Sequence, residues 1–180
     1  IAGSDMRFIT YADPPKHVDV HGIDDHRLTK VPIGSFGSTV PTSHGNVILI
    51  FHQYAYIARG KSIHSSIQLE HGGSTVDDRS VLLGGSQSIT TPSGYVVPLD
   101  LFEGLCYING RPFTDEEWRT LPHVDITREF PVWDPSTYNK KISDDTSWFD
   151  THSAGPVLDG TLEPGPTAQA CESFSAHVTP

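Results

Sequence analysis

Cysteine, methionine and long apolar runs are scarce in this chain of 180 residues. Its two cysteines, Cys106 and Cys171, are too few for a disulfide framework, and they fit a reducing compartment. The longest apolar run covers residues 47–51, far short of the ~20 residues of a membrane-spanning helix. No signal peptide is recognisable at the start of the sequence. We therefore expect an intracellular, cytoplasmic protein with no membrane partner.

Basic side chains are also in short supply. The chain has 12 Lys and Arg against 22 Asp and Glu, a net charge of −10, and no cluster of basic residues. Binding to nucleic acid depends on such clusters, so a nucleic-acid partner is not expected. The hydrophobic fraction of 36% is low for a fully packed chain. We expect an acidic, aromatic extension over residues 126–150 and a disordered tail over residues 151–180, which is rich in Pro, Gly and Ser.

Complete catalytic motifs are missing from the sequence. It contains no Gly-x-Ser-x-Gly, no Walker motif, no Cys-x-x-Cys and no Asp-Ser-Gly or Asp-Thr-Gly. His17, His21 and His26 form the most metal-like cluster, but two residues four apart on a strand are ~13 Å apart. This spacing favours a solvated strand face over a metal site, and a metal-dependent hydrolase remains a distant third hypothesis. We expect no catalytic residue, no metal and no cofactor.

Alternating apolar and polar residues predict a mostly β fold. The strongest strand spans residues 47–56 and belongs inside a sheet, because it is apolar on both faces at its start. Its alternation places His52, Tyr54 and Tyr56 on one face. Such a row of polar aromatic side chains is typical of a half-buried sheet surface, and it could also form a ligand-binding stripe. Glycines at 34 and 37 predict bulges or close backbone approach. The other predicted strands cover residues 6–11, 17–23, 31–40, 80–83, 87–91, 94–101 and 104–109.

Two short helices complete the predicted elements. The first covers residues 62–71 and is stopped by the glycines at 72 and 73. The second covers residues 114–121, where Thr114 and Glu117 form a capping box and Pro122 ends the helix. Phe113 and Trp118 occupy the positions of a hydrophobic staple.

The order of these segments resembles a known family. Residues 1–3 (Ile-Ala-Gly) are followed by Val-His-Gly-Ile at 20–23, an apolar strand, and Ile-His-Ser-Ser-Ile-Gln-Leu-Glu-x-Gly at 63–72. This succession is similar to the protease segment of copia-type LTR retrotransposon polyproteins. Residues 63–150 also resemble retroelement-derived reading frames of algal genomes, through the motifs at 63–70, 85–99, 111–124 and 133–135.

The resemblance implies a retropepsin-like closed β barrel or sandwich over residues 1–125. It implies an aspartic protease whose catalytic Asp-Ser-Gly loop would precede Ile1, so this chain is expected to be inactive as given. The implied partners are a polypeptide substrate or polyprotein neighbours and a second copy in a homodimer, inside retroelement particles. The hairpin turn at Thr42, Ser43, His44 and Gly45 would cover the substrate. The alternative is a non-enzymatic β-rich binding or structural domain derived from a retroelement.

Overall fold

The computed structural model describes residues 1–22 and 26–138 and confirms the mostly β class, with a few short helices. Ile1–Pro135 form one compact unit, which is described below; of the second unit, Ser136–Pro180, only residues 136–138 are described. The predicted tail at 151–180, and the predicted extension from residue 139 onward, lie outside the described residues. None of the described helices is long and apolar enough to cross a membrane.

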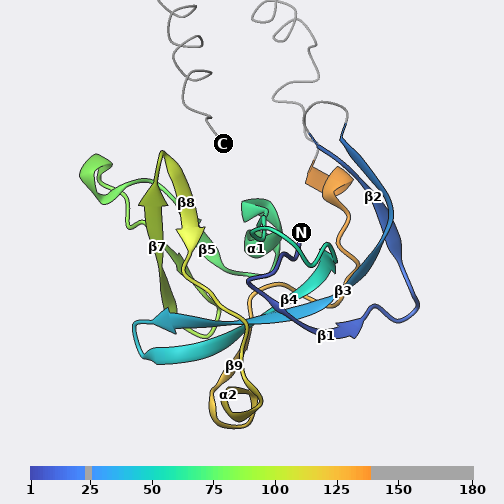
Figure 1. The fold of residues 1–180 in the computed structure, drawn as a ribbon. Coiled ribbons are helices and arrows are strands. Elements are labelled where there is room, and N and C mark those ends of the chain that lie inside the picture. The colour runs from blue at the N-terminus through green and yellow to red at the C-terminus, as the bar shows by residue number, and fades with distance from the viewer. Residues whose placement is uncertain (23–25, 139–180) are drawn as a thin grey trace, which may run out of the picture. The chain divides into compact units, whose positions relative to one another are not determined.

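The long strand β3 (Arg27–Thr42) organises the first of two curled sheets (Figure 1). Along one edge it pairs with β2 (His17–His21) and then with β1 (Arg7–Tyr11), both antiparallel. Along its other edge it pairs with β4 (Gly45–Ala55), which pairs in parallel with β9 (His123–Asp125). The predicted hairpin over residues 31–56 is thus confirmed, whereas β9 was not predicted.

The second sheet is antiparallel and has four strands in the order β5-β6-β7-β8. Its strands are β5 (Thr75–Asp77), β6 (Ser88–Thr90), β7 (Val96–Phe102) and β8 (Leu105–Ile108). The last three match predicted strands, and β5 was missed because it is only three residues long. In Figure 1 this sheet lies to one side of the β3–β4 hairpin.

The prediction of a strand at residues 80–83 is wrong, because these residues form a 3-10 helix, η1 (Val81–Leu83). The Ser80 side chain accepts a hydrogen bond from Leu82 N, and Gly84 adopts a left-handed conformation at φ 79°. A hydroxyl cap at the start and a glycine at the end are helix signals that outweighed the apolar run.

The two predicted α-helices are present but shorter. Helix α1 (Ser66–His71) begins four residues later than predicted, because the hydroxyl of Ser65 caps it by accepting from Gln68 N. Helix α2 (Asp115–Thr120) carries the predicted capping box. A further 3-10 turn, η2, covers Pro135–Tyr138.

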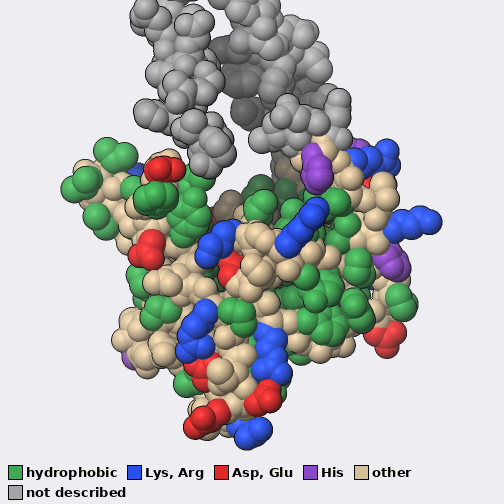
Figure 2. Space-filling model, in the orientation of Figure 1, with side chains coloured by type: hydrophobic (Ala, Val, Ile, Leu, Met, Phe, Trp, Pro, Cys, Tyr) green, Lys and Arg blue, Asp and Glu red, His purple; other side chains and the backbone are tan. Residues whose placement is uncertain are grey.

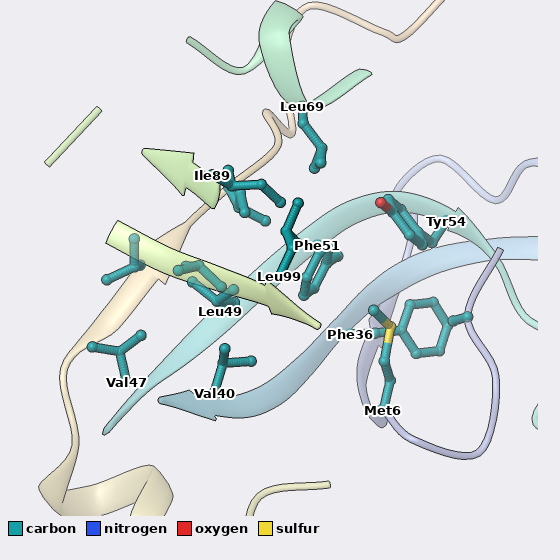
Figure 3. Packing of buried hydrophobic residues seen from close by; sticks show 14 residues of the cluster. Met6, Phe36, Val40, Val47, Leu49, Phe51, Tyr54, Leu69, Ile89 and Leu99 are labelled. Atoms are coloured by element: carbon teal, nitrogen blue, oxygen red, sulfur yellow. The ribbon is translucent and has the colours of Figure 1, made fainter. Parts of the chain in front are cut away.

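Side chains from both sheets form one hydrophobic core. Figure 3 shows Val40, Val47 and Leu49 of the β3–β4 hairpin facing Leu99 of β7, with Leu69 of α1 above them. These side chains are at most 6% exposed. The core therefore joins the second sheet and α1 to the strands of the first sheet.

Two glycines of β3 confirm the predicted close approach. A Cβ at Gly34 would lie 2.6 Å from the carbonyl oxygen of Thr10, and one at Gly37 would lie 2.6 Å from the ring of Phe113. Phe113 is buried, and Trp118 stacks on it with ring centroids 4.8 Å apart. Phe113 thus enters the core, and Trp118 covers it.

Candidate functional site

The N-terminal segment is held against the chain that follows β4. Ala2 forms a parallel bridge with Tyr56, and its N–H donates to the carbonyl of Ala55 at 2.9 Å. A Cβ at Gly3 would lie 2.4 Å from the carbonyl oxygen of Gly60, so only glycine fits at this crossing. Two segments almost 60 residues apart in sequence are therefore interlocked at backbone distance.

Asp5 closes this interlock with its carboxylate. It accepts hydrogen bonds from Ser62 N at 3.0 Å and from Ser62 Oγ at 2.5 Å. The same hydroxyl accepts from Gly3 N at 2.8 Å. Asp5 therefore holds the N-terminal segment in place, and its oxygens are engaged in doing so. No local pattern in the sequence predicts this contact, because its two partners are 57 residues apart.

A cleft of about 730 Å³ opens beside this interlock. Ile1 contributes to its wall, the strand His17–His21 forms one side, and Trp133 lies on another. Among the strands that the structure describes, β2 pairs only with β3, so no other described strand covers its second edge beside the cleft. The cleft follows β2 over its five residues and is lined by both polar and apolar side chains, which suits an extended polypeptide better than a compact small molecule.

Gln53 positions the wall opposite β2. Two residues of β4 oppose the single residue Ser35 at the register shift, and Gln53 is left-handed there, with φ 61°. Its side-chain N–H groups donate to the carbonyls of Arg128, Glu129 and Pro131, at 2.8–3.1 Å. Its Oε1 accepts from Trp133 N at 2.6 Å. One amide therefore holds residues 128–133 beside the cleft.

The bulge also overturns the predicted face of Tyr54. The sequence alternation grouped Tyr54 with His52, but the extra residue at 53 turns Tyr54 into the core, where it is 1% exposed. Burial raises the pKa of its phenol, so the hydroxyl stays protonated, and it is hydrogen-bonded to His64 Nδ1 at 3.1 Å. Burial likewise lowers the pKa of His64 to about 4. The pair is neutral, with Tyr54 buried and His64 half-buried, so the predicted stripe is not a continuous surface.

The predicted substrate-covering turn lies away from this cleft. Thr42 Oγ1 donates to the carbonyl of Gly45 at 2.6 Å, which closes the turn. Ser43 N donates to the carbonyl of Val96 at 2.9 Å, and Val96 N donates to Ser43 Oγ at 3.3 Å. The Nδ1 atom of His44 and the Oγ atom of Ser43 are hydrogen-bonded at 2.8 Å. The turn is thus bound to β7, and its role as a cover stays a prediction.

The histidines of the predicted metal-like cluster are spread along the β2–β3 hairpin. His17 and His21 lie at opposite ends of β2, and His26 lies just before β3. Asp19, between the two strand histidines, is bound to Arg27 at 2.7 Å, and this hydrogen bond lowers the pKa of its carboxyl. In residues 1–22 and 26–138 no group of three His, Cys, Asp or Glu side chains is placed to hold a metal ion. Asp24 and Asp25 lie outside the described residues.

A Ser-His-Asp chain that the sequence did not suggest links three strands. Ser35 Oγ lies 2.8 Å from His52 Nδ1, and His52 Nε2 lies 3.2 Å from Asp125 Oδ1. The same residue types activate a serine nucleophile in hydrolases, but there the hydroxyl faces a substrate. Ser35 is only 7% exposed, and the recess beside it holds about 30 Å³, the space of one or two water molecules. These three hydrogen-bonded side chains therefore have a structural role, which is to connect β3, β4 and β9.

Comparison with known proteins adds no assignment. No family model matches the chain, and no curated protein or solved structure matches it. The proposals below therefore depend on the geometry described here and on the resemblance of its motifs.

Proposed function

We propose that this chain is the peptide-binding body of a retropepsin-like aspartic protease domain from a copia-type retrotransposon polyprotein. It is catalytically silent as given, because it contains no Asp-Ser-Gly or Asp-Thr-Gly. The proposal implies an intracellular protein, within the cytoplasm or retroelement particles, that meets polypeptide segments of its own polyprotein.

The observation that carries this proposal is the interlock of residues 1–5 beside the cleft. The resemblance puts the catalytic loop directly before Ile1, and Ile1 is part of the cleft wall. In a longer chain, the residues that directly precede Ile1 would lie at the cleft. Gly3 and Asp5 fix that direction through their contacts with Gly60 and Ser62.

The chemistry of the proposed parent domain follows from charge. Two chains would each supply one aspartate at a twofold axis, where two adjacent carboxylates share one proton. One then acts as general base toward a water molecule and the other as general acid toward the leaving amine. The aspartates of the described residues do not form such a pair in the cleft; Asp19 is bound to Arg27 and Asp5 to Ser62.

The test is the reading frame immediately upstream of Ile1. We expect an in-frame Asp-Ser-Gly or Asp-Thr-Gly there, and pepstatin-sensitive cleavage of polyprotein-derived peptides by the extended chain. An aspartate-to-asparagine change in that motif is the matched control and should abolish cleavage, and the 180-residue chain should show none. An upstream frame without the motif, or cleavage by the 180-residue chain itself, would contradict the proposal.

The same extended chain decides which hairpin covers the substrate. The resemblance assigns this role to the turn of Ser43 and His44, whereas the geometry favours the β2–β3 hairpin, because β2 lines the cleft. Val18→Arg on β2 should raise KM for a peptide if the β2–β3 hairpin covers it. Ser43→Arg should do so if the turn does, and each variant is the control for the other.

A second candidate is a non-enzymatic binding domain derived from a retroelement. It is favoured by one observation, namely that the cleft of about 730 Å³ is present while its described lining contains no pair of carboxylates. Peptide binding by the 180-residue chain, together with an upstream frame that lacks the aspartate motif, would select this candidate. Sedimentation of the extended chain would show whether a homodimer forms.

A further inference from the structure

The free edge of β8 borders a second groove, separate from the cleft beside Ile1. The groove has a volume of about 520 Å³. Residues 61–64 form one wall, and residues 105–110, which include all of β8, form the other. Because consecutive residues of β8 line it, the groove follows the backbone edge of the strand rather than one of its faces.

The hydrogen-bond pattern of the β7–β8 hairpin shows which backbone groups face this groove. The hairpin has a two-residue turn, Glu103-Gly104, with φ values of 50° and 80°, so the flanking pair of Phe102 and Leu105 is hydrogen-bonded. Alternation then places the N–H and C=O of Cys106, and the N–H of Ile108, on the side away from β7.

Two observed bonds agree with this alternation. Leu99, the partner of Ile108, directs its N–H to the carbonyl of Gln87 and thus away from β8. The carbonyl of Ile108 accepts from Gly110 N at 2.9 Å, outside the β7–β8 ladder. Among the described strands β8 pairs with β7 alone, and outside that ladder no backbone bond between described residues reaches the N–H or C=O of Cys106 or the N–H of Ile108. The groove therefore presents three unpaired backbone groups in a row along one strand edge.

The edge lacks most of the devices that normally prevent strand addition. Strand β8 reads Leu-Cys-Tyr-Ile, with no proline, charge or bulge, and shortness is its one protective feature. Exposed apolar side chains border it, with Phe102 and Leu105 each 62% exposed. Figure 2 shows hydrophobic side chains gathered over this end of the second sheet.

Charge defines the sequence that would fit. The hairpin from Val96 to Ile108, which carries the pairing edge, has Asp100 and Glu103 and no Lys or Arg, whereas the opposite wall of the groove contributes Lys61. Asp100 shares its face with Tyr107, its partner in β8, while Cys106 and Ile108 point to the opposite, concave face toward Ile89 and Leu99. A strand laid along β8 would thus present apolar side chains to the concave face and basic ones to the face of Asp100.

We propose that the β8 edge binds an extended polypeptide with alternating apolar and basic residues by β-strand addition. The peptide lies in the groove between β8 and residues 61–64 and pairs with the backbone of Cys106 and Ile108. This site is independent of the proposed protease cleft, because the residues that carry it do not line that cleft.

The probe is the labelled peptide acetyl-Lys-Val-Lys-Val-Lys-Val-amide, measured by fluorescence anisotropy at low salt. Two further peptides carry N-methyl groups either at every valine or at every lysine. We expect one of them to bind at least about tenfold more weakly and the other to bind like the parent, because only alternate amides of an added strand face β8. Weaker binding of the peptide that is methylated at the valines would indicate antiparallel addition. In that arrangement a valine lies directly opposite Cys106, on the same face of the sheet, and its amide forms the hydrogen bond to β8. Equal effects of the two methylated peptides, or no binding of the parent peptide, would overturn the proposal.

A matched pair of variants tests the protein side. Cys106→Pro removes the edge N–H and should weaken binding at least about tenfold, whereas Cys106→Ser keeps it and should bind like the wild type. Amide exchange gives an independent readout in the unmodified chain. The amides of Cys106 and Ile108 should exchange fast alone and at least about tenfold more slowly with peptide, while those of Leu105 and Tyr107 stay protected throughout. Exchange without this alternation contradicts the proposal, even if Cys106→Pro fails to fold.

A second copy of the chain is the competing occupant of the edge. In that case the amides of Cys106 and Ile108 would be protected without peptide, and the protection would fall on dilution together with the sedimenting mass. That result would overturn the peptide assignment.

Discussion

Replacing His64 should change how the stability of this protein depends on pH. The imidazole lies against the ring of Phe51, with centroids 4.9 Å apart, and is hydrogen-bonded to the hydroxyl of Tyr54. Burial lowers its pKa to about 4; the positive α-amino group of Ile1 lowers it further, and Asp5 opposes the shift. Between pH 6.5 and 4 the unfolded chain therefore binds a proton that the folded chain excludes.

The sign and size of the effect follow from this difference. A histidine with a lowered folded pKa contributes its full stability above pH 6.5 and loses it as the pH falls toward 4. The gap between 6.5 and about 4 corresponds to about 3 kcal/mol, since each pKa unit is worth about 1.4 kcal/mol. His64→Gln keeps a polar side chain of similar length but does not titrate.

Urea unfolding of the wild type and His64→Gln at pH 7, 6, 5 and 4 measures the effect. Other titrating groups are common to both proteins, so only the difference between the two free energies of unfolding matters. We expect the advantage of the wild type to shrink by about 3 kcal/mol between pH 7 and pH 4. Parallel profiles, or an NMR titration that gives His64 a pKa near 6.5, would refute the assignment of a neutral, half-buried imidazole.

Three further substitutions test other contacts by the same unfolding assay. Gly37→Ala should destabilise the protein by about 1–3 kcal/mol, because the new Cβ would lie 2.6 Å from the ring of Phe113. Thr114→Ala removes the cap of α2 and should cost about 1 kcal/mol, while Thr114→Ser should cost less. His52→Ala leaves the buried hydroxyl of Ser35 without its partner and should cost about 1–3 kcal/mol; an unchanged stability would show that the Ser-His-Asp tie is dispensable.

The features that the sequence predicted well are those that depend on neighbours along the chain. Alternation located the β3–β4 hairpin, and the Thr114 and Glu117 spacing located α2 and its capping box. Glycine at 34 and 37 correctly indicated close packing, although it could not name Thr10 or Phe113 as the partners. Each of these signals lies within a few residues of the structure that it specifies.

The features that were missed depend on contacts across the chain. The contact of Asp5 with Ser62 joins segments 57 residues apart, and strand β9 forms only because β4 offers it an edge. The strand predicted at 80–83 is wrong for a local reason, since the cap by Ser80 and the left-handed Gly84 enclose a 3-10 helix despite the apolar run. Tyr54 was placed on the wrong face because alternation assumes a regular strand.

The irregularity at Gln53 connects the core with the cleft. A regular β4 would direct Tyr54 away from the core, and the hydrogen bond from its hydroxyl to His64 could not form as it does here. The same left-handed residue aims its own amide at the carbonyls of residues 128–131 and at Trp133, the far wall of the cleft. One inserted residue thus fills the core on one side of the sheet and holds a cleft wall on the other. Because an asparagine or glycine would adopt this conformation more easily, the long amide of Gln53 is explained by its reach and not by the backbone.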